Sequence, residues 1–207
     1  MPGANIGKII VFDLDKTLTY KDTLMGFFFF VSKKNLSFVL KLCKYFVMIA
    51  KKKNHIISLF ELNNTAVKLF LKEYDINELN ILSKRYSKKI KFNNIYYNDY
   101  ILFSEDKRNK VIISSASLSI YLNYIGFKEL IASELEYNND KPIGIKFHNY
   151  GENKLMKLKE LGIDHINILY TDSKSDKSLA SISNRVIIVG KDKKRICNSY
   201  EEYLEAI

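Results

Sequence analysis

The sequence predicts an α/β protein, in which a Rossmann-like parallel sheet carries a helical cap inserted after its first strand. Three observations lead to this prediction. Short apolar runs alternate with segments of helical spacing along much of the 207-residue chain, as in a parallel, doubly wound sheet. Residues 20–95 interrupt that alternation with helical spacing alone. The excess positive charge lies in the same interval, which is therefore expected to be a separate substructure.

Four apolar runs are expected to form the sheet. Continuous runs of this kind are typical of strands that are buried on both faces. The runs are Lys8–Leu14, Lys110–Ser115, His165–Thr171 and Arg185–Gly190. Polar residues stand at the end of the first three, so chemistry is expected at the carboxyl ends of these strands.

Helical patterns and one hairpin fill the intervals between these strands. The expected helices are Leu118–Ile125, Glu152–Leu161 and Lys174–Ser183. Gly162 follows the second of them, and glycine commonly ends a helix. Two further segments flank Asn-Asn-Asp-Lys-Pro, a turn composition that predicts a hairpin between them. These segments are Leu130–Tyr137 and Ile143–Asn149.

The interval 20–95 is expected to form the helical cap, and residues 1–19 with 96–207 the Rossmann-like core. Within the cap, helical spacing runs through Leu36–Ala50, Ile56–Leu71 and Ile76–Ile90. From residue 20 to 95 there are 15 Lys and Arg against five Asp and Glu, whereas the rest of the chain holds 18 of each sign. The net charge of +10 therefore belongs to the cap, which predicts an anionic partner.

Composition narrows the class of protein. Hydrophobic residues make up 47% of the chain, enough for a buried core, and only two prolines and eight glycines argue against disordered linkers. Cys43 and Cys197 have no metal-ligand spacing around them and are expected to be reduced thiols. The first residues lack the apolar segment of a signal peptide. The expected compartment is the cytoplasm.

Polar signals stand at the ends of three expected strands and at the start of one expected helix. Two are pairs of aspartates, one is a serine and one is a lysine. In chain order the residues are Asp13, Asp15, Ser115, Lys154, Asp172 and Asp176. Because the carboxyl ends of parallel strands open at the same edge of a sheet, these side chains are expected to share one site.

This set of residues suits the hydrolysis of a phosphate monoester. An anionic phosphate resists attack, so a covalent aspartyl-phosphate that divides the reaction into two steps lowers the barrier. Asp13 is the expected nucleophile. Asp15 is expected to protonate the leaving oxygen and then to activate water.

A metal ion is expected beside these aspartates. Mg²⁺ prefers hard oxygen ligands, which the carboxylates of Asp13 and Asp172 and the main-chain carbonyl of Asp15 would provide. Asp176 is expected to orient a metal-bound water or Lys154 without binding the metal itself.

Two further residues are expected to hold the phosphate. Ser115 and Lys154 would bind its non-bridging oxygens and offset their charge. Ser114 and Ser117 are alternatives to Ser115, because all three lie at the end of the same strand.

The signals match, in order, the motifs of one enzyme superfamily. They are Asp-x-Asp-x-Thr at Asp13–Thr17, the serine of the second motif at Ser115, the lysine of the third at Lys154 and Asp-x-x-x-Asp at Asp172–Asp176. The chain thus resembles the haloacid dehalogenase superfamily of phosphohydrolases over nearly its whole length. The resemblance implies a Rossmann-like core, use of Mg²⁺, and phosphate binding by Thr17 beside Ser115 and Lys154.

The place of the cap refines this resemblance. A helical insert between the first and second motifs is similar to the cap of the phosphoserine phosphatase-like subclass. The stretches Ser115–Ser117 and Asp172–Lys177 resemble a bacterial branch to which phosphatidylglycerophosphate phosphatases are assigned.

Four positions bear on the substrate. Lys16 stands where many members have glycine or another small residue, and Thr171 where glycine commonly precedes the fourth motif. Asp22 falls where phosphoserine phosphatases carry a substrate-facing glutamate. The cap holds a single arginine, Arg85, with which to bind a carboxylate, so phosphoserine is not the favoured substrate.

The most apolar cap helix suggests the favoured substrate. The segment Leu36–Ala50 is apolar except for Ser37, Lys41 and Lys44, which recur at helical spacing and are expected to form a narrow polar stripe. The segment is too short to span a bilayer. Such a face beside lysines is similar to an interfacial helix, and internal packing is the alternative. The expected partner is a phosphorylated small molecule or lipid, with peripheral contact to the anionic inner face of a membrane.

Two other functions compete with this one. The first is a phosphatase of a soluble metabolite, such as a sugar or amino-acid phosphate. The second is a nucleic-acid-binding module, in which the aromatic and basic residues between Lys84 and Tyr100 would stack bases and neutralise phosphates. No recognised nucleic-acid motif accompanies them, so nucleic acid is not the expected partner.

Overall fold

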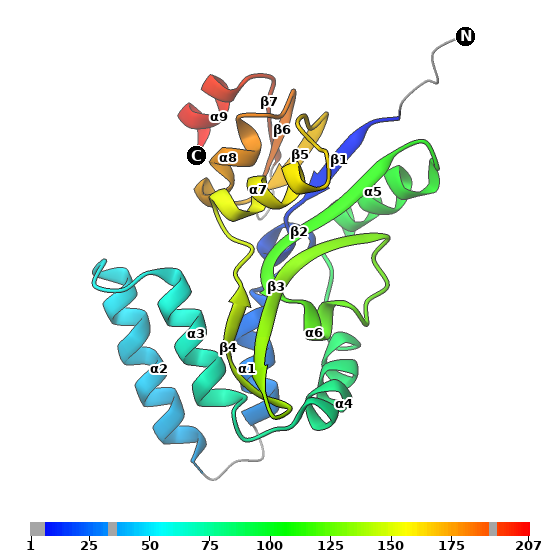
Figure 1. The fold of residues 1–207 in the computed structure, drawn as a ribbon. Coiled ribbons are helices and arrows are strands. Elements are labelled where there is room, and N and C mark those ends of the chain that lie inside the picture. Colours follow the sequence, from blue (N-terminus) through cyan, green and yellow to red (C-terminus); the bar gives the residue numbers. More distant parts are fainter. Residues whose placement is uncertain (1–6, 33–36, 191–193) are drawn as a thin grey trace.

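The computed structural model describes residues 7–32, 37–190 and 194–207. Its centre is a seven-stranded sheet with the strand order β4-β3-β2-β1-β5-β6-β7 (Figure 1). The strands are β1 (Ile9–Phe12), β2 (Lys110–Leu118), β3 (Glu129–Asn138), β4 (Lys141–Phe147), β5 (Ile168–Thr171), β6 (Val186–Val189) and β7 (Lys194–Cys197).

The sheet is parallel from β3 through β6 in spatial order, and antiparallel only where β4 and β7 form its edges. The predicted α/β class and Rossmann-like sheet are therefore confirmed. The last residue of β1, Phe12, pairs with Ile113 of β2 and Tyr170 of β5. β7 was not predicted, because three of its four residues are exposed and its sequence shows no apolar run.

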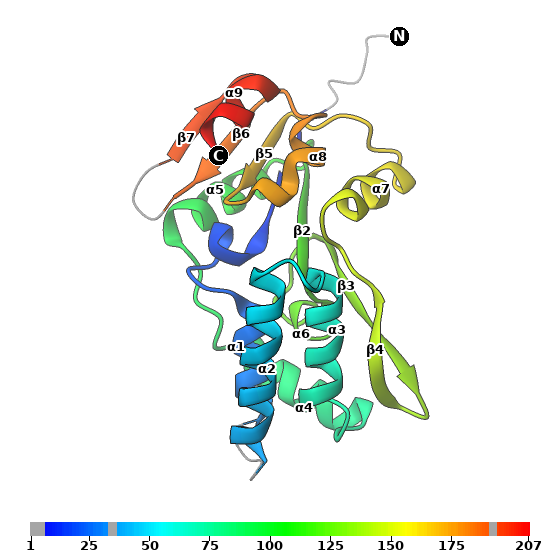
Figure 2. The ribbon, with the colours of Figure 1, turned by 90° about the vertical axis from the view of Figure 1, so that its left-hand side faces the viewer.

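The helices fall into two groups (Figures 1 and 2). Helices α1 to α4 gather at one end of the sheet, and α5, α7, α8 and α9 flank its strands. The bounds are α1 (Thr23–Ser32), α2 (Phe38–Lys53), α3 (Leu59–Phe70), α4 (Ile76–Ser87), α5 (Asn94–Glu105), α6 (Ser119–Leu122), α7 (Glu152–Glu160), α8 (Lys177–Ala180) and α9 (Tyr200–Ala206). The helices of the first group follow β1 and precede β2, as expected for a cap inserted after the first strand.

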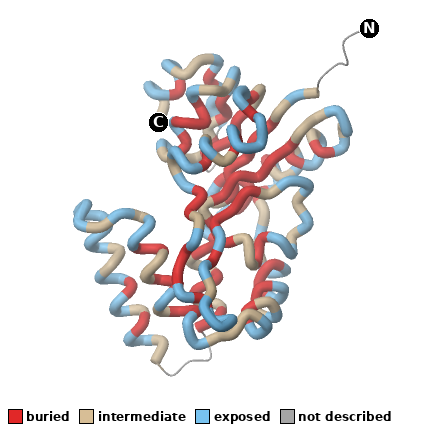
Figure 3. The backbone as a smooth tube through the Cα atoms, viewed as in Figure 1, coloured by how far each residue is buried: buried red, intermediate tan, exposed pale blue. Residues whose placement is uncertain are grey.

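Alternate residues of β1 point into two separate hydrophobic cores. Phe12 packs edge-on against Tyr100 of α5, with ring centroids 5.9 Å apart. Val11 faces the opposite core, with Leu158 of α7 and Leu179 of α8. Figure 3 shows the central strands as the most continuously buried part of the chain. A strand covered on both faces holds the residue that follows it in a fixed position.

Local hydrogen bonds fix where two cap helices begin. Ser58 and Glu61 form a capping box at the start of α3, and Asp75 and Glu78 form another at the start of α4. Each box satisfies main-chain N–H groups that the first helical turn leaves without partners.

Helix α2 presents a different face to the core than its sequence suggested. It begins at Phe38, and the expected start at Leu36 lies outside the described residues. Lys41, expected beside Lys44 on a polar stripe, is buried and forms an ion pair with Glu73 at 3.0 Å. Lys44 is exposed. Among the described residues, no helix is both long and apolar enough to cross a membrane.

The predicted hairpin is confirmed as β3 and β4, and its far end reaches the cap. The Oδ1 atom of Asn64 on α3 accepts a hydrogen bond from the main-chain N–H of Ile145 on β4, at 2.8 Å. Gly144 permits this approach, because a Cβ atom there would lie 2.5 Å from the same oxygen.

Candidate active site

The site begins at the carboxyl end of β1. Asp13 directly follows that strand, and its main-chain N–H donates to the carbonyl of Tyr170 on β5 at 2.9 Å. The chain then turns tightly through Leu14–Leu18. Asp13 and Thr17 are both buried, and the Thr17 hydroxyl lies 3.4 Å from Asp13 Oδ2.

Lys154 joins two carboxylates at the centre of the site. Its Nζ atom lies 2.7 Å from Asp13 Oδ1 and 2.8 Å from Asp176 Oδ1, and its side chain is only 2% exposed. Burial lowers the pKa of Lys154, but the charges of Asp13 and Asp176 outweigh that effect and keep the amine protonated. Burial raises the pKa of Asp13 to about 7, although the Lys154 charge opposes the shift.

Thr171 gives a physical reason for one departure from the family pattern. Its hydroxyl donates to Asp176 Oδ2 at 2.6 Å, so Asp176 is held from one side by Thr171 and from the other by Lys154. A glycine at position 171 would leave the Oδ2 atom of Asp176, which is fully buried, without this hydrogen-bond donor.

Lys16 is the other departure from the family pattern. Its backbone is left-handed, with φ of 62°, a conformation that glycine adopts at no steric cost and that other residues adopt rarely. The preference for a small residue at this position thus has a backbone cause. Burial raises the pKa of Asp172, and the Lys16 charge opposes that shift, so the two residues interact electrostatically.

Asp15 points toward the cap. Its Oδ1 accepts the main-chain N–H of Thr23 at 2.6 Å, and its Oδ2 accepts the hydroxyl of Ser117 at 2.5 Å. Burial, followed by the nearby charge of Asp22, raises the pKa of Asp15 to about 6. The proposed acid–base group is therefore held by the first residue of a cap helix and by the end of β2.

Further contacts extend this arrangement beyond the predicted residues. The Thr23 hydroxyl lies 3.1 Å from the Ser117 hydroxyl and 2.9 Å from the hydroxyl of Tyr121 on α6. Tyr86 of α4 donates to the main-chain carbonyl of Thr23 at 2.7 Å. Ser117 was predicted only as an alternative phosphate-binding serine. Thr23, Tyr86 and Tyr121 were not predicted at the site, because they come from distant segments and match no local pattern.

The three serines at the end of β2 occupy different surroundings. Ser115 is fully buried, and its hydroxyl accepts the main-chain N–H of Ser117 at 3.1 Å. The hydroxyl of Ser114 accepts a hydrogen bond from Asn149 at 3.1 Å. Ser117 lines the cavity of the site together with Ala116. Phosphate binding by Ser115 stays a prediction.

Asn149 is a site-supporting residue that the sequence analysis missed. It is fully buried, and its amide donates to the main-chain carbonyls of Ser115 and Ile131 at 3.1 and 3.0 Å. It therefore ties the strand end that carries Ser115 to β3. The sequence held one signal that could have pointed to Asn149: it is a polar residue between an apolar strand and Gly151, shortly before Lys154.

A cavity of about 340 Å³ opens between these residues and the cap. The carboxylates of Asp13, Asp15 and Asp172 lie on its core side. Its cap side mixes apolar and polar groups, namely Asp22, Leu24, Met25, Tyr45, Lys52, Leu59 and Asn63. The structure thus brings the predicted nucleophile, acid–base group and second metal ligand to one cavity that the cap covers.

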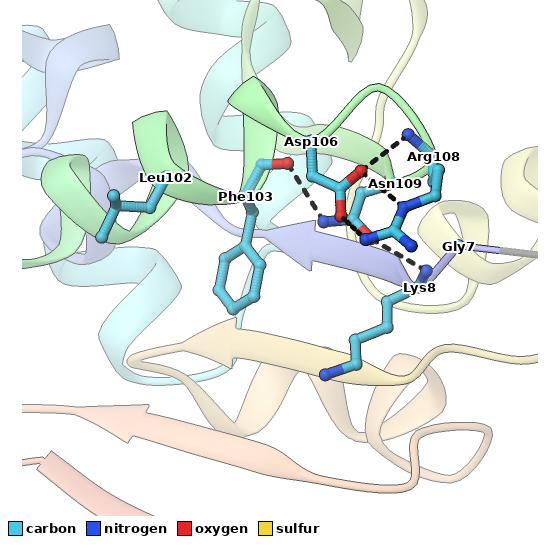
Figure 4. A pocket seen from close by; sticks show the side chains of 7 residues that line it. All are labelled: Gly7, Lys8, Leu102, Phe103, Asp106, Arg108 and Asn109. Carbon is cyan, nitrogen blue, oxygen red and sulfur yellow. Dashed lines mark hydrogen bonds and ion pairs between the residues drawn. The ribbon is translucent and has the colours of Figure 1, made fainter.

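A second cavity, of about 440 Å³, lies at the amino-terminal ends of β1 and β2, beside Lys8 and Phe103 (Figure 4). Its polar groups are largely satisfied by one another. Arg108 donates to Asp106 at 2.8 Å, and Asn109 donates to the Phe103 carbonyl at 3.2 Å. It holds none of the site carboxylates.

His148 is a buried titratable residue beside the cap. One ring nitrogen, Nε2, lies 3.2 Å from the Asn63 amide on α3, and the ring stacks on Tyr150. Burial lowers the pKa of His148 to about 4. The unfolded chain would titrate near pH 6.5, so the contribution of the neutral ring to stability is present above that pH and is lost as the pH falls toward 4.

We expect this group to lower the free energy of unfolding by up to about 3 kcal/mol between pH 7 and pH 4. His148→Gln keeps a neutral polar side chain and should remove that part of the pH dependence. Urea unfolding of both proteins at pH 7, 5.5 and 4.5 measures the difference. Parallel pH curves for the two proteins would contradict the expectation.

Comparison with known families agrees with this geometry. The family sequence model of the haloacid dehalogenase-like hydrolases matches residues 10–181, an interval that contains all four motifs. The chain therefore belongs to the haloacid dehalogenase-like hydrolase family. The predicted family and the predicted enzyme class, a phosphatase-type hydrolase, are confirmed. No curated protein sequence matches the chain significantly.

Solved structures share the fold at low sequence identity. A protein with unknown function from Bordetella pertussis Tohama I has a TM-score of 0.73 at 17% identity, over 89% of this chain and 90% of that one. A phosphoserine phosphohydrolase-like protein from Francisella tularensis subsp. tularensis SCHU S4 has a TM-score of 0.61 at 18% identity, over 87% and 86%. A phospho-aspartyl intermediate analogue of phosphoserine phosphatase has a TM-score of 0.59 at 16% identity, over 88% and 86%. At these identities the similarity establishes the fold.

Proposed function

We propose that the chain is a Mg²⁺-dependent phosphomonoesterase that forms an aspartyl-phosphate on Asp13. One observation carries the proposal: a buried strand-end carboxylate lies at the base of a cap-covered cavity, fixed 2.7 Å from a buried lysine. Such a carboxylate can attack phosphorus while the lysine offsets the charge of the phosphate. The phospho-aspartyl analogue of the structurally similar phosphatase supports the same intermediate.

In the first step an oxygen of Asp13 forms a bond to phosphorus, and the bond from phosphorus to the ester oxygen breaks. Asp15 gives its proton to that leaving oxygen, and a pKa of about 6 leaves part of its population protonated near neutral pH. In the second step Asp15 takes a proton from water, which attacks the phosphorus. The bond to Asp13 then breaks and phosphate is released.

The other predicted residues bind and orient. Lys154 would move from a purely internal ion pair to contact with the phosphate oxygens, and Asp176 with Thr171 would hold it in place. Thr17 would bind phosphate beside Asp13, as would the hydroxyl of Ser115 after release of its contact with Ser117.

The residues present fit a Mg²⁺ ion. Asp13, Asp15 and Asp172 line one cavity and offer only hard oxygen donors. Burial raises the pKa of each of the three carboxyl groups, so their charges are poorly solvated and a cation beside them would be favourable. Among the described residues no three His, Cys, Asp or Glu side chains form a ready metal cluster, but the expected set needs two carboxylates and the Asp15 carbonyl. When bound, the ion would offset the charge of the phosphate.

Two variants separate the roles of these aspartates. Asp172→Asn should weaken Mg²⁺ binding by at least about tenfold, because it removes a charged ligand. Asp15→Asn should leave that affinity largely intact, since the main-chain carbonyl stays, but should lower kcat by about 10²–10⁴-fold. Titration calorimetry with Mg²⁺ and p-nitrophenyl phosphate assays measure the two effects. Equal losses of affinity in both variants would refute the division of roles.

We also propose the division into a catalytic core, residues 1–19 and 96–207, and a cap, residues 20–95. The cap supplies the cavity wall opposite the nucleophile, so it is the part that would select the substrate. The hairpin of β3 and β4, which packs on α3, would then support the cap from the core side.

The substrate we favour is a phosphorylated lipid or other amphiphile, acted on at the periphery of an anionic membrane. Leu24, Met25 and Leu59 give the cap side of the cavity an apolar surface. A phosphorylated amino acid is the second candidate, because Asp22 and Lys52 line the same cavity and could face an ammonium and a carboxylate. Phosphate release from a panel of phosphorylated lipids, sugars and amino acids, with and without Mg²⁺, tests both. No release from any of them would refute the proposed function.

Nucleic-acid binding through the aromatic residues near Tyr96 finds no support. Tyr86, Tyr96 and Tyr100 are buried, and Phe92 stacks on Tyr97 with ring centroids 4.3 Å apart. These rings belong to the packing between α4, α5 and their neighbours. They offer no free platform on which a base could stack.

A further inference from the structure

The outer face of α2 is apolar and exposed to solvent. Six residues form it at helical spacing, and we call them the α2 stripe: Val39, Leu40, Cys43, Phe46, Val47 and Ala50. Leu40 is 69% exposed and Phe46 55% exposed, although large apolar side chains are usually covered. A contiguous stripe of this kind marks a surface that contacts something else.

The opposite face of the same helix belongs to the site. Tyr45 and Lys52 line the catalytic cavity, and Lys41 is buried against Glu73. The packing of α2 on the cap is therefore already satisfied by its inner face. Helix α2 lies on the side of the molecule that faces the viewer in Figure 2. The α2 stripe is on the face of this helix away from the cavity, about one helix diameter of 10 Å from it.

Lysines border the α2 stripe. At 3.6 residues per turn, Lys44 and Lys51 project along one border and Lys53 along the other, and all three are exposed. Helix α2 contains no acidic residue. An apolar stripe between basic borders is the pattern of a helix that lies in a membrane interface, where lysine chains reach back to the headgroups.

Charge decides which partner fits this surface. A second copy of the chain would bring Lys44, Lys51 and Lys53 against the same lysines, and like charges oppose such pairing. A nucleic acid would neutralise the lysines but would leave the apolar stripe without cover. An anionic lipid bilayer satisfies both features, since acyl chains accept the stripe and headgroups accept the lysines.

We propose that the α2 stripe docks the protein on the surface of an anionic lipid bilayer, peripherally and reversibly. Docked in this way, α2 has one face in the interface and the other on the catalytic cavity. The cavity then lies at the level of the headgroups, an orientation that serves phosphate release from a lipid; this last step rests on the proposed function.

The protein carries its own probe for the test. Cys43 is exposed in the middle of the α2 stripe, whereas Cys197 is buried. A polarity-sensitive, thiol-reactive dye on Cys43 should shift to the blue with vesicles of phosphatidylglycerol and phosphatidylcholine, and much less with phosphatidylcholine alone. High salt should reverse the shift. The same dye on Leu102→Cys in a Cys43→Ser background is the control, and it should stay unchanged.

Matched variants locate the surface by vesicle sedimentation. Phe46→Ser with Val47→Ser, and separately Lys44→Glu with Lys51→Glu, should each weaken binding by at least about tenfold. Ile95→Ser with Leu102→Ser removes an apolar pair on α5 that is more exposed, at 64% and 65% against 55% and 56%, and should not weaken binding.

A second control addresses net charge. Lys141→Glu with Lys159→Glu changes the charge of the protein by the same amount as the α2 pair, at exposed positions away from α2, and should weaken binding far less. Equal binding to both vesicle types at low salt, or equal weakening by the α2 and control pairs, overturns the inference. So does light scattering that shows a dimer which the α2 variants dissociate.

Hydrolysis of p-nitrophenyl phosphate separates this inference from the proposed function. The substrate is soluble, and none of the substituted residues lines the cavity. The α2 variants should therefore keep wild-type turnover of it. A protein that binds vesicles but releases no phosphate would refute only the proposed function, and an active phosphatase indifferent to vesicles would refute only the docking surface.

Discussion

Asp13→Asn is expected to lower the Mg²⁺-dependent turnover of p-nitrophenyl phosphate by about 10⁴-fold or more while the protein stays folded. The amide keeps the shape of the side chain but lacks the negative oxygen that attacks phosphorus. Burial already raises the pKa of Asp13 to about 7, so removing its charge should cost little stability. Lys154 keeps its contact with Asp176 Oδ1, 2.8 Å away.

Two measurements make this expectation specific. Acid-quenched wild-type enzyme, reduced with borohydride, should show an aspartyl-phosphate as homoserine at position 13 by peptide mass spectrometry, and Asp13→Asn should not. Asp164→Asn, a change of the same kind at an exposed position, should behave as wild type in both assays. Wild-type turnover in Asp13→Asn, or a label on another residue, would show that the covalent mechanism is wrong.

The parts of the fold that the sequence could predict are those with a local pattern. The strands before Asp13, Ser115 and Asp172 are continuous apolar runs, and the polar residue that ends each run is visible without knowing its neighbours. Because parallel strands open at one edge, their convergence followed from topology alone. The structure places Asp13 and Asp172 on the same cavity for this reason.

The groups that hold Asp15 could not be predicted in the same way. Thr23 and Ser117 are 94 positions apart in sequence, and their hydroxyls meet only because the cap helix α1 returns to the end of β2. Ser117 was considered only for phosphate binding, and Thr23 does not stand out locally, since serine and threonine are common at helix starts and strand ends. Contacts of this kind depend on the packing of the cap, which no sequence period records.

The exposed face of helix α2 could not be predicted from the sequence either. Its spacing predicted a helix correctly but did not say which face would be buried. Lys41 was expected beside Lys44 on one polar stripe. It is instead buried, where Glu73 offsets its charge at 3.0 Å, whereas Lys44 is exposed. Lys41 and Tyr45 share the buried face, and the apolar residues on the other side of the helix are exposed to solvent. The helical period alone does not distinguish these two orientations.

Lys154→Met is expected to have the largest effect on stability. It removes the only cation within ion-pair distance of the Asp13 and Asp176 carboxylates among the described residues. Breaking a buried ion pair by removing one partner costs about 3–5 kcal/mol, because the other charge stays buried without compensation. Turnover should also fall by about 10²–10³-fold or more, since the phosphate loses a fixed positive charge.

Urea unfolding and p-nitrophenyl phosphate assays of paired variants test this account. Lys157→Met, on the same helix, breaks an exposed ion pair with Glu160 and should change neither quantity appreciably. Adding Asp176→Asn to Lys154→Met removes one of the two stranded charges, so the double variant should regain part of the lost stability while activity stays low. If the double variant is less stable than Lys154→Met alone, uncompensated charge is not what Lys154 prevents, and its role in the fold must come from the packing of its side chain.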